Sequence, residues 1–207
     1  MKNSYWNLDK IGRVKLSKNF QMRQFLYSEI ATSACIPNIP DDPDLAIEAG
    51  KKLCENILEP LVEAFGPIIV RSGYRSCAVN DFGWRNRLAC SSNEDNYAYH
   101  IWDRIDRYGC MGAAACLIVP IFNAGLSQFK TWQDFAWWMD DRLDHNGITF
   151  FKQDYAFNIG WSEDGDPTIH STRDDGPKTI KGYRRSKAER DTAALNPHPP
   201  RQQDQLV

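Results

Sequence analysis

Apolar residues recur at helical spacing in three parts of the chain. Between residues 44 and 65 they follow steps of about four residues, and Pro60 within this stretch is expected to kink or divide the helix. Residues 91–109 show a similar apolar face. Residues 131–146 form a third periodic segment, in which Thr131 with Asp134 resembles a capping box and which Gly147 is expected to end. The pattern therefore predicts three helices.

Between and after these segments, runs rich in β-branched and apolar residues predict strands. The run IIVRSGYRS leads into a glycine turn, and the continuously apolar AAACLIVPI is typical of a buried strand. Two further strands are expected in ITFFKQDYAFNIGW and PTIHST, on either side of the turn SEDGD. Helices combined with strands in this order predict an α+β fold, with a mostly antiparallel sheet packed against helices.

The composition changes near Pro177. Residues 177–207 carry seven Lys or Arg and three acids, a net charge of +4, which leaves −6 on the preceding residues. The segment is polar and contains prolines, so it cannot bury enough apolar surface to fold alone. We expect one domain over residues 1–176 and an extended or disordered basic tail over residues 177–207, which orders on a partner protein.

Several classes of protein are not expected. No stretch approaches the roughly 20 apolar residues of a membrane helix, and the N-terminal residues lack the apolar region of a signal peptide. The six cysteines are expected to be reduced thiols, with Cys54 in the core. The basic–aromatic run YRRSK is short, so binding to nucleic acid is not expected.

Two segments, LSKNFQMRQFL and LEPLVEAFGPIIVRSGYRSCAVN, carry a resemblance to a known family. They are similar to the peptidase M15 family, the zinc D-Ala-D-Ala carboxypeptidases and related phage endolysins, in the opening L-S-x-x-F, in a helix ending L-x-P-L-R-x-x-F-G-P, and in the turn S-G-Y-R-S followed by V-N. The resemblance covers roughly residues 15–175 and is more specific in its first half. It implies an M15-like domain with an insertion around residues 81–108.

The resemblance also implies a catalytic apparatus, from which this chain departs. Arg75 matches the arginine that stabilises the oxyanion during peptide hydrolysis, a role that suits a guanidinium group. Aligning the strand motif H-x-x-G-x-A-x-D places Gly109 at the histidine ligand and Cys116 at the aspartate ligand, whereas His170 matches the last histidine. Asp154 lies two residues from the expected position of the glutamate base.

The altered site allows three interpretations. In the first, the metal site is lost, because glycine offers no ligand and one histidine does not hold zinc. In the second, Cys110 and Cys116 join His170 in a rebuilt Cys-Cys-His zinc site. In the third, His100 replaces the lost histidine from a helix in the inserted segment.

The first interpretation predicts a non-catalytic M15-like domain that needs no cofactor. It would act as a structural or interaction module, and on resemblance a bacteriophage virion component of the tail or baseplate, in contact with other virion proteins through its C-terminal tail. The alternative is a zinc-dependent carboxypeptidase or endopeptidase that hydrolyses bacterial cell-wall peptides. The corresponding locations are the cytoplasm or the virion, with no membrane as partner.

Overall fold

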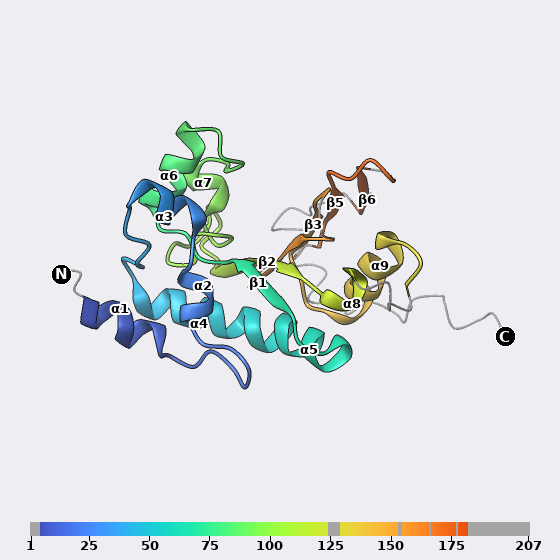
Figure 1. Cartoon of the computed structure of the whole chain (residues 1–207), viewed down its shortest axis with the longest axis horizontal. Helices are drawn as coiled ribbons and strands as arrows, with labels where there is room; N and C mark the ends of the chain where they lie inside the picture. Colours follow the sequence, from blue (N-terminus) through green and yellow to red (C-terminus); the bar gives the residue numbers. More distant parts are fainter. Residues whose placement is uncertain (1–4, 124–128, 153–154, 166, 177, 182–207) are drawn as a thin grey trace.

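The computed structural model describes residues 5–123, 129–152, 155–165, 167–176 and 178–181 (Figure 1). These residues form a six-stranded sheet with the order β1-β2-β4-β3-β5-β6, accompanied by helices. All neighbouring strands are antiparallel except β3 and β5, which are parallel. The predicted α+β class with a mostly antiparallel sheet is therefore confirmed. The strands are β1 (Ile69–Ser72), β2 (Gly112–Ile118), β3 (Gly147–Phe150), β4 (Phe157–Ser162), β5 (Ile169–Ser171) and β6 (Thr179–Lys181).

The predicted helix between residues 44 and 65 is present and is divided before its proline. It consists of α4 (Pro43–Leu53), the π-helical turn η1 (Cys54–Leu58) and α5 (Glu59–Phe65). Pro60 has no amide hydrogen and its ring would crowd the carbonyl four residues earlier, so the regular hydrogen-bond pattern is interrupted there. Gly66, with φ +77°, ends α5.

One face of the sheet packs on this divided helix to form the core (Figure 1). Successive side chains of a strand point to opposite faces, and in β2 and β4 the alternating residues on the core face are apolar. The core face carries Ala113, Ala115, Leu117, Phe157, Ile159 and Trp161. The polar residues of these strands consequently lie on the opposite face.

The remaining helices are short, apart from α9, whose Trp132, Phe135 and Met139 also enter the core. The capping box predicted at its start is confirmed, since Thr131 and Asp134 each accept a hydrogen bond from the other's backbone. The others are α1 (Tyr5–Gly12), α2 (Arg23–Leu26), α3 (Glu29–Ala34), α6 (Cys77–Arg85), α7 (Asn93–Asn96) and α8 (Pro120–Asn123); α9 spans Trp132–Arg142.

The prediction of a helix over residues 91–109 was wrong. Only α7 forms, and residues 97–104 make a series of turns in which Ala98 has φ +55° and donates its N–H to the carbonyls of Ile101 and Arg104. The amide of Ala114 in β2 donates to the carbonyl of Tyr99 at 2.7 Å. Backbone pairing with β2 thus replaces the helical hydrogen bonds that the periodicity suggested.

The predicted end of the last helix also needs correction. The helix α9 stops at Arg142, and Gly147 begins β3 instead of ending the helix. Leu143 is extended at the end of α9, so the chain turns before it reaches the glycine. The single strand predicted over residues 148–161 is a pair, β3 and β4, which run antiparallel to each other.

The sheet extends beyond the predicted start of the tail. Strand β6 pairs with β5, and Lys181 donates from Nζ to Asp140 Oδ1 at 2.7 Å. Asp140 also contacts buried His145, with 3.2 Å between Nε2 and Oδ1. This contact with a buried carboxylate ties residues 179–181 to the domain, so they are not part of an independent tail. Residues 182–207 lie outside the described residues.

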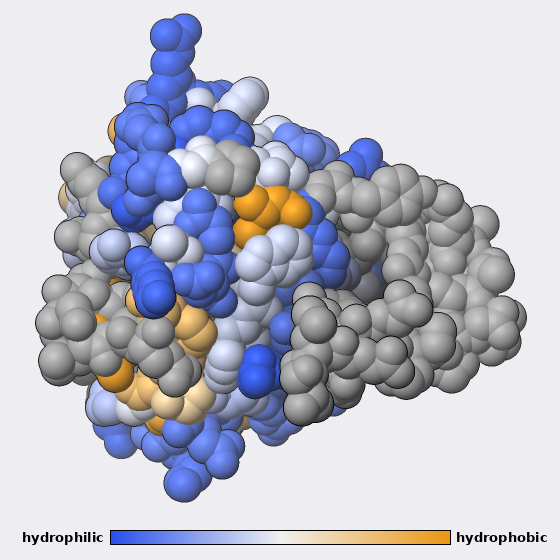
Figure 2. Space-filling view, turned by 90° about the vertical axis from the view of Figure 1, so that its right-hand side faces the viewer, coloured by the Kyte–Doolittle hydropathy of each residue, from blue (hydrophilic) through white to orange (hydrophobic). Residues whose placement is uncertain are grey.

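Figure 2 shows the side of the molecule that lies at the right in Figure 1. The described residues visible there are mostly hydrophilic, and hydrophobic residues appear as separate small areas. Within the described part of the chain, no helix is both long and apolar enough to cross a membrane. All six cysteines are free thiols, and Cys54 is buried in the core, as predicted.

Candidate functional site

The arginine-bearing turn that follows β1 is held by bonds to three other segments. The amide of Tyr74 donates to the Phe25 carbonyl at 3.0 Å, and the amide of Arg75 donates to the His100 carbonyl at 2.8 Å. Asn38 accepts from the amide of Ser76 at 2.7 Å and donates to the Tyr74 carbonyl at 2.9 Å. These bonds bring Arg75 and His100, which are 25 positions apart, into contact.

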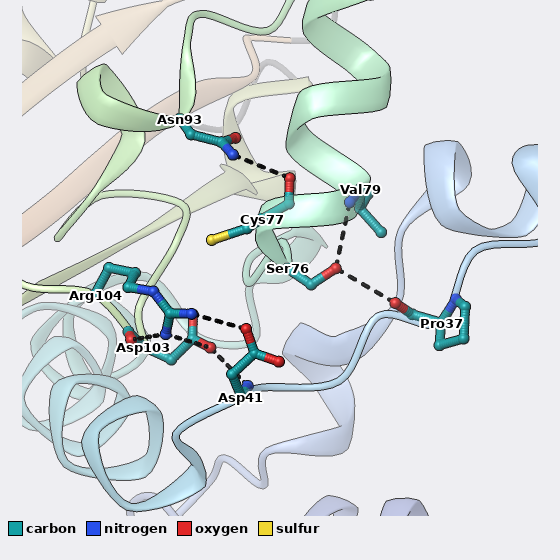
Figure 3. A network of polar contacts seen from close by, with 8 residues as sticks. All are labelled: Pro37, Asp41, Ser76, Cys77, Val79, Asn93, Asp103 and Arg104. Atoms are coloured by element: carbon teal, nitrogen blue, oxygen red, sulfur yellow. Dashed lines mark hydrogen bonds and ion pairs between the residues drawn. The ribbon is translucent and has the colours of Figure 1, made fainter. Parts of the chain in front are cut away.

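Residues on both sides of this contact are held by a second polar network (Figure 3). Arg104 donates from Nη2 to Asp41 at 2.7 Å, and the buried carboxylate of Asp103 accepts from the Asp41 amide at 2.7 Å. At the start of α6, Ser76 donates to the Pro37 carbonyl at 3.3 Å. The segment around residues 37–41 therefore connects the Arg75 turn with the turns that follow His100.

His100 is buried, and its ring is oriented by two hydrogen bonds. Its Nδ1 lies 2.9 Å from the Gly73 carbonyl oxygen. Because a carbonyl can only accept, Nδ1 carries the hydrogen and Nε2 presents a lone pair. Nε2 lies 3.2 Å from the Nδ2 atom of Asn158, which fits an amide donating to the imidazole. Burial, together with the nearby charge of Arg75, lowers the pKa of His100 to about 3, so the ring is neutral near pH 7.

Cys116 and Asn158 are directly opposite each other on β2 and β4. Cross-strand partners point to the same face of a sheet, and for this pair it is the face away from the core. Burial raises the pKa of the Cys116 thiol, although the charges of Arg71 and Arg75 lower it in part. The thiol therefore stays protonated near neutral pH, which makes it a weak metal ligand and a weak nucleophile.

Tyr99 and Arg75 complete the group of polar side chains at this point. The Tyr99 ring packs edge-on against His100, with 4.9 Å between centroids, and its hydroxyl bonds Asn158. Burial raises the pKa of Tyr99 to about 12. We call Arg75, Tyr99, His100, Cys116 and Asn158 the His100 cluster. No hydrogen bond among the described residues joins any of these five side chains to a carboxylate.

The guanidinium group of Arg75 is anchored by neutral partners. Its Nη1 donates to Asn80 Oδ1 at 3.1 Å and to Cys90 Sγ at 2.8 Å. Arg75 makes no ion pair with a carboxylate of the described residues, so its charge is not neutralised locally. A half-buried guanidinium in this setting can bind an anionic group of a ligand through its remaining donors.

His170 does not join Cys116. It lies on β5, exposed, with its Nδ1 3.0 Å from the hydroxyl oxygen of Thr179. Cys116, Asn158, Thr149 and His170 form one row across neighbouring strands. Three strand spacings therefore separate Cys116 from His170, about 14 Å. The resemblance implied that both residues belong to one metal site, but the sequence could not predict that β4 and β3 lie between them.

Of the other two predicted ligands, one lies far from Cys116 and one lies close to it. Cys110 lies two residues before the first residue of β2, Gly112. Gly112 and Cys116 are four residues apart on this strand, about 13 Å, so Cys110 is distant from Cys116. His100 does reach Cys116 and Arg75, from a turn and not from the predicted helix. Among the described residues, no three His, Cys, Asp or Glu side chains are grouped so that they could hold a metal ion. Asp154 lies outside the described residues.

Sequence reasoning missed Asn158 and Tyr99. Asn158 interrupts the apolar run AFNIGW at a position that alternates with Phe157 and Ile159, so a period-of-two pattern marks it as a polar residue facing away from the core. Tyr99 carried no comparable signal, because its place depends on the backbone pairing between the turns and β2.

The protonation state of His100 can be tested directly. We expect its imidazole resonances to stay constant between pH 8 and pH 5 in an NMR titration, since the pKa of about 3 lies below this range. In Arg75→Met the pKa should rise, because a positive charge is removed, and it should stay below the usual value of about 6.5 because burial persists. A His100 titration near pH 6.5 would contradict the described burial.

Comparison of the chain with protein-family models, with curated proteins and with solved structures finds no match in any of the three.

Proposed function

We propose that this chain is a non-catalytic relative of the M15 zinc peptidases that works as an interaction or structural module. The observation that carries the proposal is the composition of the His100 cluster. Where a zinc peptidase needs three ligands and a carboxylate base, this cluster has a neutral imidazole, an amide, a phenol and a protonated thiol beside an arginine. These groups form hydrogen bonds well, but they neither retain zinc firmly nor activate water.

The residues of the cluster do not fit a zinc ion. The Nε2 lone pair of His100 accepts from Asn158, the thiol of Cys116 has a raised pKa, and a carboxamide is a weak ligand for zinc. No step of a hydrolytic mechanism is therefore assigned to this chain. Arg75 keeps a role in binding, as the cation that would receive a carboxylate or carbonyl group of a bound peptide.

A virion of a bacteriophage is the setting that the resemblance to phage M15 proteins favours. A module that holds a cell-wall peptide or a neighbouring virion protein without cutting it requires binding groups in fixed positions, and the His100 cluster is held by bonds to β1, β2, β4 and the Asn38 segment. In this proposal the partner is another protein or a peptidoglycan peptide.

The alternative, a zinc-dependent peptidase of cell-wall peptides, is favoured by one observation. A hydrogen bond from Nδ1 to a backbone carbonyl is the usual support of a zinc-binding histidine, and His100 has it with Gly73. In this alternative His100 and Cys116 would hold the ion, Arg75 would stabilise the oxyanion, and Asp154 would be tested as the base.

One experiment separates the two functions. The full chain is purified without chelator, its metal content is measured by mass spectrometry, and stem peptides are incubated with it and analysed for cleavage. We expect zinc well below one ion per chain, no cleavage, and retained binding of the intact peptide. Zinc at one ion per chain that is lost in Cys116→Ser but kept in His170→Ala, with cleavage, would establish the peptidase instead.

A further inference from the structure

A second arginine, Arg71, lies on the face of the sheet that carries the His100 cluster. The register of β1 on β2 shifts between Val70 and Ser72, whose partners on β2 are consecutive residues. Arg71 is thus the extra residue of a β-bulge, a feature that redirects a side chain. Val70 packs against the core, whereas Arg71 is exposed. Arg71 therefore faces away from the core, as Cys116 does.

Three charges surround the thiol of Cys116. The charges of Arg71 and Arg75 lower its pKa, and the charge of Glu29 raises it. A charge has this effect only from nearby, so the three groups lie close to the thiol. His100 is neutral near pH 7, and two arginines with one glutamate therefore leave a local net charge of +1.

Both guanidinium groups keep donors that the protein does not use. Arg75 bonds Asn80 and Cys90 through Nη1 alone. Among the described residues, Arg71 donates no hydrogen bond, and neither arginine forms an ion pair with Glu29 or another carboxylate. Since a guanidinium carries five N–H donors, several of them remain for an anionic ligand.

An apolar surface adjoins the two arginines. Ile69 is 51% exposed and lies directly opposite Ile118, so the two side chains share one face of the sheet. Ile118 follows Cys116 by two positions on β2, which makes it the outer face. Strand β1 is at the edge of the sheet formed by the described residues. A ligand with an anionic group and an aliphatic part would find a partner for each.

We propose that Arg71 and Arg75 together bind a carboxylate of a peptide, either its C-terminal group or an acidic side chain, with an aliphatic side chain of the peptide against Ile69. A planar guanidinium pairs with a carboxylate through two parallel hydrogen bonds. The local charge of +1 suits a monoanion, whereas a phosphate dianion would be repelled more strongly by Glu29. This inference rests on the proposed function, because it names the group that a bound peptide presents to the His100 cluster.

The test is an NMR titration of the full chain with three short peptides. Acetyl-Ala-Leu offers a C-terminal carboxylate, acetyl-Glu-Leu-amide offers only a side-chain carboxylate, and acetyl-Gln-Leu-amide offers neither. We expect one of the first two to shift the amides of Arg71, Ser72 and Cys116, and the third to leave them unchanged. The peptide that binds identifies the source of the carboxylate, and its binding should weaken as ionic strength rises.

Three single variants assign the effect to the proposed charges. We expect Arg71→Gln to weaken binding about fivefold and Glu29→Gln to strengthen it about twofold, the range for exposed charge pairs. The matched control, Arg142→Gln, removes an exposed arginine from α9, the helix that packs into the core, and should leave binding unchanged. Equal losses in Arg71→Gln and Arg142→Gln would overturn the proposal.

The wild-type chain alone also decides the question. Equal binding of the acidic and the uncharged peptides, or stronger competition by inorganic phosphate than by acetate, would contradict a carboxylate site even if a variant fails to fold. Either result would leave a non-catalytic binding module intact. Cleavage of a bound peptide, in contrast, would contradict the proposed function and not the carboxylate site.

Discussion

Replacing Trp102 by alanine is expected to lower the free energy of unfolding by about 3–5 kcal/mol, the range for a large aromatic residue removed from a core. Trp102 is fully buried, and its ring packs on Phe25 with 5.2 Å between centroids. Its Nε1 donates to the Ala114 carbonyl at 3.1 Å. Gly50 of α4 permits the close approach, since a Cβ atom there would lie 2.9 Å from the indole.

This prediction tests the turns that replace the expected helix. Chemical denaturation with urea measures the loss, and Trp137→Ala in α9 is the matched control, because that side chain is 42% exposed. The control should change stability by less than about 1 kcal/mol. Trp102→Phe should keep most of the packing and lose roughly 1 kcal/mol with the hydrogen bond. Similar losses in the two alanine variants would mean that residues 97–104 are not packed on β2 as described.

The second large effect concerns metal binding. We expect the double variant Cys116→Asp with Asn158→His to bind zinc at least about a hundredfold more tightly than the wild-type chain, because it provides one carboxylate and two imidazoles where the wild type offers one usable imidazole. The two changed positions are directly opposite on β2 and β4. His100 already directs its Nε2 atom to position 158. Isothermal titration with zinc measures the gain.

Two further variants make this result specific. Adding His100→Gln to the double variant should abolish the gain, because one of the three ligands is lost. Placing the new histidine one strand further, as Cys116→Asp with Thr149→His, should give no comparable gain, since Thr149 is the partner of Asn158 and not of Cys116. A folded double variant that binds zinc no better than the wild type would show that the three positions do not converge.

Local features of the sequence predicted several elements correctly. Pro60 divided its helix, Thr131 and Asp134 formed the capping box, and the apolar run around Cys116 became the buried strand β2. Each of these depends on neighbours within a few residues, where hydrogen-bond patterns and side-chain periodicity act directly. The helix expected over residues 91–109 failed because its apolar spacing did not mark one buried face: Ile101 is buried, whereas Ile105 and Tyr108 are exposed.

The sequence by itself determined the class of the fold, the turn that presents Arg75 and the strand that carries Cys116. Only the tertiary structure decided that His100 and Asn158 complete the cluster and that His170 stands apart from it. Strand order and the pairing of the 97–104 turns with β2 decide which distant residues meet, and they result from packing of the whole core. No pattern within a short window of sequence specifies that packing.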